Sequence, residues 1–259
     1  MSSFSILESD TIFFTNSRIL RDEEFHQLRE LFPARFHLIE EKIRDYKSAS
    51  RKQEVLLSRA LIFLLSRFSD VIIEFYDGLF KKKEVIVTPE GNSILNRRLK
   101  ASISHSVDWI AVGISSGKAI GVDVFYKGKG FGKVKRVVKR FLPELIVSIG
   151  DNDEDIALSW TIFESFLKIG DYSLESISGF LRYSKEIQLE KRWVKCRMGQ
   201  IGSEVFRLYT MNIDYLDVIG SMVVRTGASD KIGLKCYMVK KINPCETTLT
   251  RVLEMEELS

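Results

Sequence analysis

The sequence predicts an α+β protein with two lobes. Helical periodicity dominates the chain before residue 70, strand-like segments follow it, and the same order of helix before strands recurs in the second half. The chain has 259 residues, of which 45% are hydrophobic, so it can bury one large core or two smaller ones. We therefore expect an N-terminal lobe of residues 1–118 and a C-terminal lobe of residues 119–259, with the seam near Gly117.

The first half is expected to contain two helices and several strands. Apolar residues recur every three or four positions over residues 22–47 and, more strongly, over residues 50–68, which predicts helices. Short apolar segments bounded by turn-forming residues predict strands. These strands are expected over residues 71–76, 84–88, 102–106 and 109–115.

The second half is expected to begin with a strand over residues 119–125. A glycine- and lysine-rich stretch at 127–135 then leads into a short helix over 137–142. Acidic residues at 151–155 precede a helix over 156–169, where they complement the helix dipole, and Gly170 is a natural stop. From Ile177 onward the pattern indicates strands over residues 177–183, 187–195, 205–213 and 218–224. The role of the segment after Asn243 stays open, with a loose tail as one alternative.

Composition excludes several classes of protein. Charged residues make up 29% of the chain and only four prolines occur, which argues against long disorder. The formal net charge of +4 suits an acidic partner or a polyphosphate ligand without requiring nucleic acid. Three cysteines without CxxC spacing predict neither a disulfide framework nor a zinc site, and a reducing cytoplasm fits best. The N-terminus lacks the order of a signal peptide, and the longest apolar run, at residues 60–65, is too short to span a membrane.

Polar residues on the expected helix 156–169 are candidates for chemistry. Trp160, Glu164 and Lys168 are spaced four and four, so they share one face of the helix. Glu164 and Lys168 can form an ordinary stabilising pair within the helix, or they can belong to a site.

An acidic residue lies within an apolar strand at residues 119–125. Alternation puts Gly121, Asp123 and Phe125 on one face of this strand. Asp123 is either a solvent-facing residue near the strand end or a ligand for Mg²⁺, which prefers hard oxygen donors and takes phosphate oxygens as well. A buried carboxylate is unfavourable unless something pairs with it.

A third polar group precedes that strand. His105 is one of three histidines, and a lone histidine near a strand is commonly structural. With Ser104 and Ser106 it nevertheless offers several hydrogen-bond donors, which suit a phosphate cluster.

In their order and spacing these three blocks resemble the signature of the 4'-phosphopantetheinyl transferases. The blocks are Ser104-His105-Ser106, Gly121-Val122-Asp123, and Trp160 to Lys168. The similarity is closer to the large, monomeric, two-lobed type that activates peptide and polyketide synthases than to the short trimeric type. A weaker similarity extends upstream to residues 56–61, which resemble a helix of the N-terminal lobe in that family.

The resemblance implies a fold and a reaction. It implies two pseudo-twofold-related α/β lobes with the active site in the cleft between them, coenzyme A as the donor and Mg²⁺ as the cofactor. The 4'-phosphopantetheine group would pass to a serine hydroxyl of an apo acyl or peptidyl carrier protein, leaving 3',5'-ADP. The chain would act as a cytoplasmic monomer, with no nucleic-acid or membrane partner.

The resemblance also implies roles for single residues. Asp123 and Glu164 match the metal-binding acids, and Glu164 and Lys168 match the catalytic pair, in which Lys168 contacts phosphate. Ser104, His105, Asp123 and Lys168 are expected to bind coenzyme A. Lys52, together with Arg51, is a further candidate for contact with its nucleotide phosphates.

Three positions depart from the family pattern. Phe125 stands where a second acid is common, and Phe163 stands where a lysine usually precedes the catalytic glutamate. Gly91-Asn92-Ser93 stands where a Gly-Lys-Pro run is usual. The last two departures remove positive charge, which leaves open a transferase-like domain that binds coenzyme A or a carrier protein without turnover. The carrier and pathway, and Mg²⁺ against Mn²⁺, also stay open.

A basic stretch follows the strand with Asp123. Residues 127–140 hold seven Lys or Arg and no acid. This stretch is either a solvated surface or a docking surface for an acidic carrier-protein helix, with Phe131, Val137 and Phe141 as apolar contacts. A nucleic-acid-binding protein is a third class, but no known motif and no stacking platform supports it.

Overall fold

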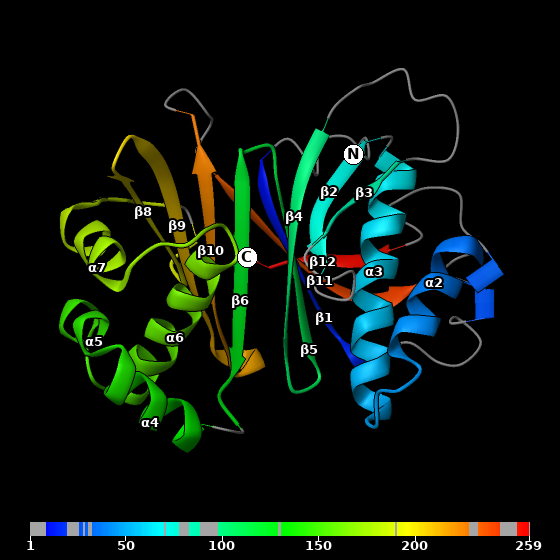
Figure 1. The fold of residues 1–259 in the computed structure, drawn as a ribbon, viewed down its shortest axis with the longest axis horizontal. Coiled ribbons are helices and arrows are strands. Elements are labelled where there is room, and N and C mark those ends of the chain that lie inside the picture. Colours follow the sequence, from blue (N-terminus) through cyan, green and yellow to red (C-terminus); the bar gives the residue numbers. More distant parts are fainter. Residues whose placement is uncertain are drawn as a thin grey trace. The chain divides into compact units, whose positions relative to one another are not determined.

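The computed structural model describes residues 9–19, 26–27, 29–30, 33–69, 71–77, 83–88, 98–128, 131–189, 191–227, 233–243 and 253–258. Across these residues the chain is mixed α+β, with two sheets and six α-helices, so the predicted class is confirmed. The chain divides into two compact units (Figure 1). The first comprises Met1–Ser102, Asp108–Ser116 and Leu234–Ser259, and the second comprises Ile103–Val107 and Gly117–Gly233.

The first unit contains most of a seven-stranded sheet. Its strand order is β12-β11-β1-β5-β4-β2-β3, and the last four residues of β4 belong to the second unit. The bounds are β1 (Asp10–Asn16), β2 (Ile72–Asp77), β3 (Lys83–Val87), β4 (Arg98–Ser106), β5 (Trp109–Ser115), β11 (Leu234–Ile242) and β12 (Leu253–Glu257). A 3₁₀ turn, η2 (Ser17–Ile19), follows β1.

Helix α3 (Ala49–Ser69) is the main helix of the first unit, and α2 (Pro33–Ile43) packs on it. Apolar residues at helical spacing, among them Val55, Leu61 and Leu65, are fully buried as α3 packs against β5. The prediction of a helix over residues 50–68 is confirmed. Within the helical region predicted over residues 22–47, the longest continuous helix that the structure describes is α2, residues 33–43.

The end of the chain packs differently from the expectation. We expected residues 119–259 to form one lobe, but residues 234–259 cluster with the first unit. The physical reason is that β11 pairs in parallel with β1 and β12 pairs with β11. The strands β1, β11 and β12 were absent from the sequence interpretation, and the alternative of a loose tail is wrong for Leu253–Glu257.

The second unit is a five-stranded antiparallel sheet with four helices, of which α6 and α7 make the main contacts with the strands, while α4 and α5 pack mainly on other helices. The strand order is β6-β10-β9-β8-β7. The strands are β6 (Ala119–Tyr126), β7 (Lys185–Ile187), β8 (Val194–Ile201), β9 (Glu204–Ile213) and β10 (Val218–Thr226). The helices are α4 (Phe131–Phe141), α5 (Pro143–Ile149), α6 (Asp153–Leu167) and α7 (Leu174–Tyr183), and a 3₁₀ turn, η4 (Asp214–Leu216), precedes β10.

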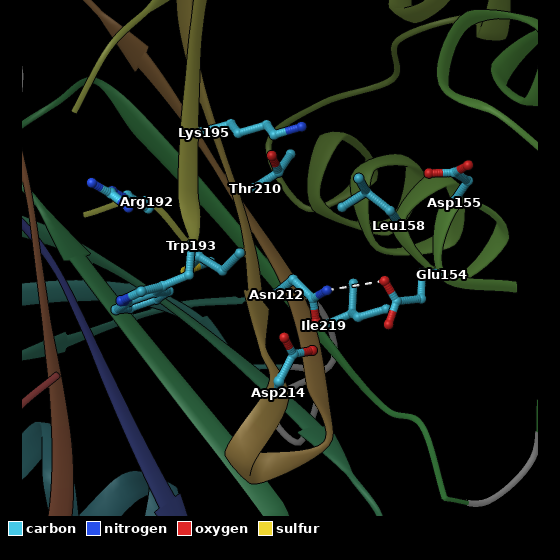
Figure 2. Close-up of a pocket in the computed structure, with 11 residues that line it drawn as sticks. Glu154, Asp155, Leu158, Arg192, Trp193, Lys195, Thr210, Asn212, Asp214 and Ile219 are labelled. Atoms are coloured by element: carbon cyan, nitrogen blue, oxygen red, sulfur yellow. Dashed lines mark hydrogen bonds between the residues drawn. The ribbon is translucent and has the colours of Figure 1, made fainter. Parts of the chain in front are cut away.

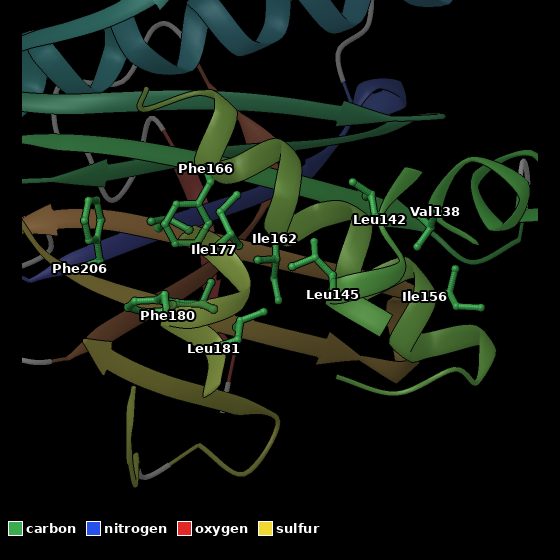
Figure 3. Packing of buried hydrophobic residues seen from close by; sticks show 12 residues of the cluster. Val138, Leu142, Leu145, Ile156, Ile162, Phe166, Ile177, Phe180, Leu181 and Phe206 are labelled. Carbon is green, nitrogen blue, oxygen red and sulfur yellow. The ribbon is translucent and has the colours of Figure 1, made fainter. Parts of the chain in front are cut away.

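Helix α6 lies across β6 and β10, and its neighbours close the core (Figure 3). The core cluster takes apolar side chains from all four helices and from β9 and β10. Phe166 of α6 lies at its centre, with ring centroids 5.6 Å from Phe180 and 5.8 Å from Phe206. This packing fixes α6 on the sheet, which matters because α6 carries two of the candidate site residues.

Several elements of the second unit differ from the prediction. Residues 177–183 form helix α7 and not a strand, because Ser173 caps the helix by accepting a hydrogen bond from Ser176 N–H and because Ile177, Phe180 and Leu181 bury one helical face. The strand predicted over 187–195 is wrong, since β7 ends at Ile187 and β8 begins at Val194.

The segment before α6 is more helical than expected. Helix α4 spans residues 131–141, so it begins six residues before the start of the helix predicted over 137–142. Helix α5, with Pro143 at its first turn, was not predicted. In the described part of the chain, none of the helices has the length and apolar character needed to cross a membrane.

Candidate active site

Asp123 lies buried in β6. It is 8% exposed and faces α6 together with Gly121 and Phe125. The alternative of a solvent-facing carboxylate is therefore wrong. Phe125, which stands where a second acid was expected, packs in an apolar cluster with Ala157 and Ile219. Only Asp123 on this face of the strand thus offers a carboxylate.

The end of β4 is tied to β6 through serine hydroxyls. Ser104 Oγ donates to Asp123 Oδ1 at 2.7 Å and accepts from Val124 N–H at 3.3 Å. Ser106 Oγ accepts from Tyr126 N–H at 2.8 Å. Because the Ser104 hydroxyl has a single proton, its donor is already used by Asp123.

Lys168 reaches the same carboxylate from the end of α6. Its Nζ donates to Asp123 Oδ1 at 2.9 Å and to the Val122 carbonyl at 2.6 Å. Lys168 is the C-cap residue of α6, so its side chain extends from the helix end to the adjacent strand. The ion pair of Lys168 is therefore made across elements with Asp123 and is not simply an in-helix pair with Glu164.

Glu164 lies one helical turn before Lys168 and is half-buried. Burial raises its pKa, the negative charge of Asp123 raises that pKa further, and Lys168 opposes both effects. The pKa of Asp123 is also raised, chiefly by burial, against the opposing effects of Lys168, Ser104 and the Val124 backbone. Two carboxylates and one ammonium group therefore interact within one small region.

This group of charges fits a divalent cation. Burial and mutual repulsion disfavour the ionised forms of Asp123 and Glu164, and a cation between them would offset both effects. Among the residues that the structure describes, no group of three or more His, Cys, Asp or Glu side chains is arranged to hold a metal ion. Asp123 and Glu164 are the two carboxylates of this group of charges, and carboxylate oxygens are the kind of ligand that Mg²⁺ prefers.

Gly121 sets how closely α6 approaches β6. A Cβ at this position would lie 1.9 Å from the Ser165 carbonyl oxygen and 3.2 Å from Lys168 Cβ. Ser165 Oγ also lies 2.8 Å from Ser221 Oγ of β10. Ser221 is the residue paired with Asp123 in the register of β10 and β6. Sequence reasoning missed this small-residue contact, although serines and a glycine at facing positions are its signal.

Gly121→Ala is expected to lower the free energy of unfolding by about 2 kcal/mol, because backbone must move to admit the methyl group. Denaturant titration measures this change. Gly132→Ala is the matched control, since nothing lies within 4 Å of its added Cβ and the helix gains propensity. Equal stability of the two variants would show that the close approach at Gly121 is not needed.

The remaining predicted residues are placed as follows. His105 lies next to Ser104 in β4 and is partly exposed. Lys52 belongs to α3 of the first unit, and its Nζ donates to the Arg44 carbonyl at 2.9 Å. Phe163 packs against the core cluster, and Asn92 lies outside the described residues. The structure thus brings together Ser104, Asp123, Glu164 and Lys168, all within the second unit.

The comparisons with known proteins add no family assignment. No protein-family model matches the chain, and no curated protein matches its sequence.

Proposed function

We propose that this chain transfers 4'-phosphopantetheine from coenzyme A to a serine hydroxyl of an apo carrier protein, releasing 3',5'-ADP. The observation that carries the proposal is the convergence of Asp123, Glu164 and Lys168, which come from two of the three sequence blocks that resemble the transferases. The pseudo-twofold arrangement of two lobes with a cleft between them, the monomeric state and the cytoplasmic location belong to the same proposal.

The residues fit the parts that this reaction needs. Asp123 and Glu164 would hold Mg²⁺, which when bound neutralises the diphosphate of coenzyme A. The carrier serine oxygen forms a bond to the phosphorus that bears pantetheine, the bond from that phosphorus to the bridging oxygen breaks, and the serine proton passes to Glu164. In the metal-free chain, burial and the charge of Asp123 raise the pKa of Glu164, and a bound Mg²⁺ would offset this rise.

Lys168 and Ser104 serve the same site in different ways. Lys168 can donate to the charge that develops on the departing 3',5'-ADP, since its ammonium already lies at Asp123. Ser104 was expected to bind coenzyme A, but its hydroxyl donates to Asp123, so we assign it the positioning of that carboxylate. His105 and Lys52 stay candidates for coenzyme A itself.

The exposed side of α4 is the proposed docking surface for the carrier. Lys127, which precedes α4, and Lys135 of α4 are paired with acidic residues of the same unit, whereas four further cations of α4 are exposed. These are Lys133, Arg136, Lys139 and Arg140. Phe141 is 57% exposed beside them, but Phe131 packs against the core clusters and is less available than expected. An acidic carrier helix complements this surface.

A carrier-modification assay tests the proposal. The protein is incubated with coenzyme A, Mg²⁺ and a panel of apo carriers, and the carriers are weighed by mass spectrometry. We expect the mass of phosphopantetheine to be added to at least one carrier.

A second candidate is a transferase-like domain that binds without turnover. It is favoured by Phe125 and Phe163, which pack in apolar clusters where the resembling family has charged groups. Saturable binding of coenzyme A with no adduct on any carrier, even at high protein concentration, would favour this candidate.

A further inference from the structure

The second unit contains a cavity away from the carboxylate pair. It has a volume of about 450 Å³ and lies between the start of α6 and the strands β8, β9 and β10 (Figure 2). Glu154, at this end of α6, is ten residues before Glu164, which corresponds to about 15 Å along a helix. A chamber of about 130 Å³ adjoins the cavity, and four residues line both: Asp155, Leu158, Lys195 and Thr210.

Two residues of opposite charge, Asp155 and Lys195, line both the cavity and the smaller chamber. Asp155 comes from the first turn of α6 and Lys195 from β8. Figure 2 shows the Lys195 side chain extending toward α6, whereas the Arg192 side chain points away from it. Among the side chains that the structure describes, neither Asp155 nor Lys195 has an ion-pair partner, although Glu154 and Asp214 nearby are both paired with Lys127.

The α6 side of the cavity is rich in acceptors. Besides Asp155 it includes Glu154, whose Oε2 accepts from Asn212 Nδ2 at 3.0 Å. Asp155 and Glu154 both bring carboxylates to this side of the cavity, so it favours a ligand that brings N–H groups.

Half of the residues that line the smaller chamber are polar or charged, among them Ser148 and Arg197, and the other half are aliphatic. Aliphatic side chains of α5, α6, α7 and β9 line it: Ile149, Leu158, Ile162, Leu181 and Leu208. Its volume of about 130 Å³ suits a branched aliphatic side chain and is too small for a long acyl chain.

We propose that this cavity binds a small apolar α-amino acid. The ammonium group lies on the acceptor side with Asp155, the carboxylate pairs with Lys195, and the aliphatic side chain enters the smaller chamber. A ligand with both charges is favoured because the two unpaired charges stand on opposite walls and do not neutralise each other. Inorganic phosphate, a nucleotide or a fatty acid brings an anion for Lys195 but no cation for Asp155. The proposal is independent of the transferase reaction.

The test uses the intact chain and three matched ligands. L-leucine, N-acetyl-L-leucine and L-leucinamide are titrated against the protein, and binding is followed by calorimetry and by NMR shifts of the backbone. We expect saturable binding of leucine. Each derivative is expected to bind at least tenfold more weakly, because N-acetylation removes the ammonium charge and amidation removes the carboxylate.

Two variants assign the charges to their partners. Asp155→Asn is expected to weaken leucine binding at least tenfold and to leave the weak binding of N-acetyl-leucine unchanged. Lys195→Met is expected to weaken leucine binding to a similar extent and to leave the weak binding of leucinamide unchanged. Asp171→Asn and Lys185→Met, both exposed and outside the cavity, are the controls. Lys195 is exposed, so its variant folds even if Asp155→Asn disturbs the start of α6.

Three results would overturn the proposal. They are no saturable binding of leucine, equal binding of leucine and N-acetyl-leucine, and tighter binding of phosphate or AMP than of leucine at the same cavity. None of them depends on phosphopantetheine transfer.

Discussion

Glu164→Gln is expected to lower the rate of phosphopantetheine transfer at least a hundredfold while the fold survives. Glutamine has nearly the shape of glutamate, but it cannot accept the serine proton and is a poor ligand for Mg²⁺. Loss of one such electrostatic contact raises the barrier by on the order of 3 kcal/mol, about a hundredfold in rate. Single-turnover mass spectrometry of the carrier measures the rate, and thermal denaturation measures the fold.

The stability of this variant provides its control. In the native chain burial and the charge of Asp123 both disfavour ionised Glu164, so a neutral glutamine is expected to be at least as stable. Asp123→Asn is expected to lose transfer to a similar extent. If either variant retains wild-type transfer, the role assigned to that carboxylate is wrong, whatever the activity of the native protein.

The pH dependence of transfer follows from the same shift. A general base acts when it is deprotonated, so transfer is expected to rise with pH through the pKa of Glu164, above the ordinary value of 4.5. Binding of a divalent cation lowers that pKa, so the rise is expected at lower pH when Mg²⁺ is increased. A pH–rate series at two Mg²⁺ concentrations measures both effects. A profile that does not move with Mg²⁺ would separate Glu164 from the metal.

Local patterns predicted the parts of the site that lie within single elements. Strand β6 and helix α6 were expected nearly where they occur, because alternation and helical spacing are properties of short segments. The commitment of the Ser104 hydroxyl to Asp123 could not be predicted, since it depends on how β4 meets β6. The pairing of Lys168 with Asp123 and not only with Glu164 depends likewise on how α6 docks.

Long-range pairing explains the larger errors. Strand β11 is placed by its parallel partner β1, more than two hundred residues earlier, and no local pattern records that partner. Residues 177–183 have a composition that suits strand or helix, and the Ser173 cap with burial of Phe180 and Leu181 in the α6 core selects the helix. Tertiary context therefore decided both the lobe boundary and the type of this element.

Lys168→Met is expected to destabilise the fold by on the order of 3 kcal/mol at neutral pH, because it leaves Asp123 buried without its counter-ion. The sign of the pH dependence follows from Asp123. Its folded pKa is raised above 3.8 by burial, so ionisation of Asp123 reduces stability as pH rises from 3.8 through the folded value. Lys168 offsets part of this reduction, and its loss raises the folded pKa further.

The destabilisation by Lys168→Met is therefore expected to be larger at pH 8 than at pH 5. Denaturant titrations at both values measure it, and the double variant Asp123→Asn with Lys168→Met is expected to remove the difference between them. Equal losses at the two pH values would assign the role of Lys168 to its bond with the Val122 carbonyl. Mg²⁺ is expected to stabilise Lys168→Met more than the native chain, because both cations need the same carboxylate. With Mg²⁺ held by Asp123 and Glu164, the Lys168 ammonium would be available to donate to the departing phosphate.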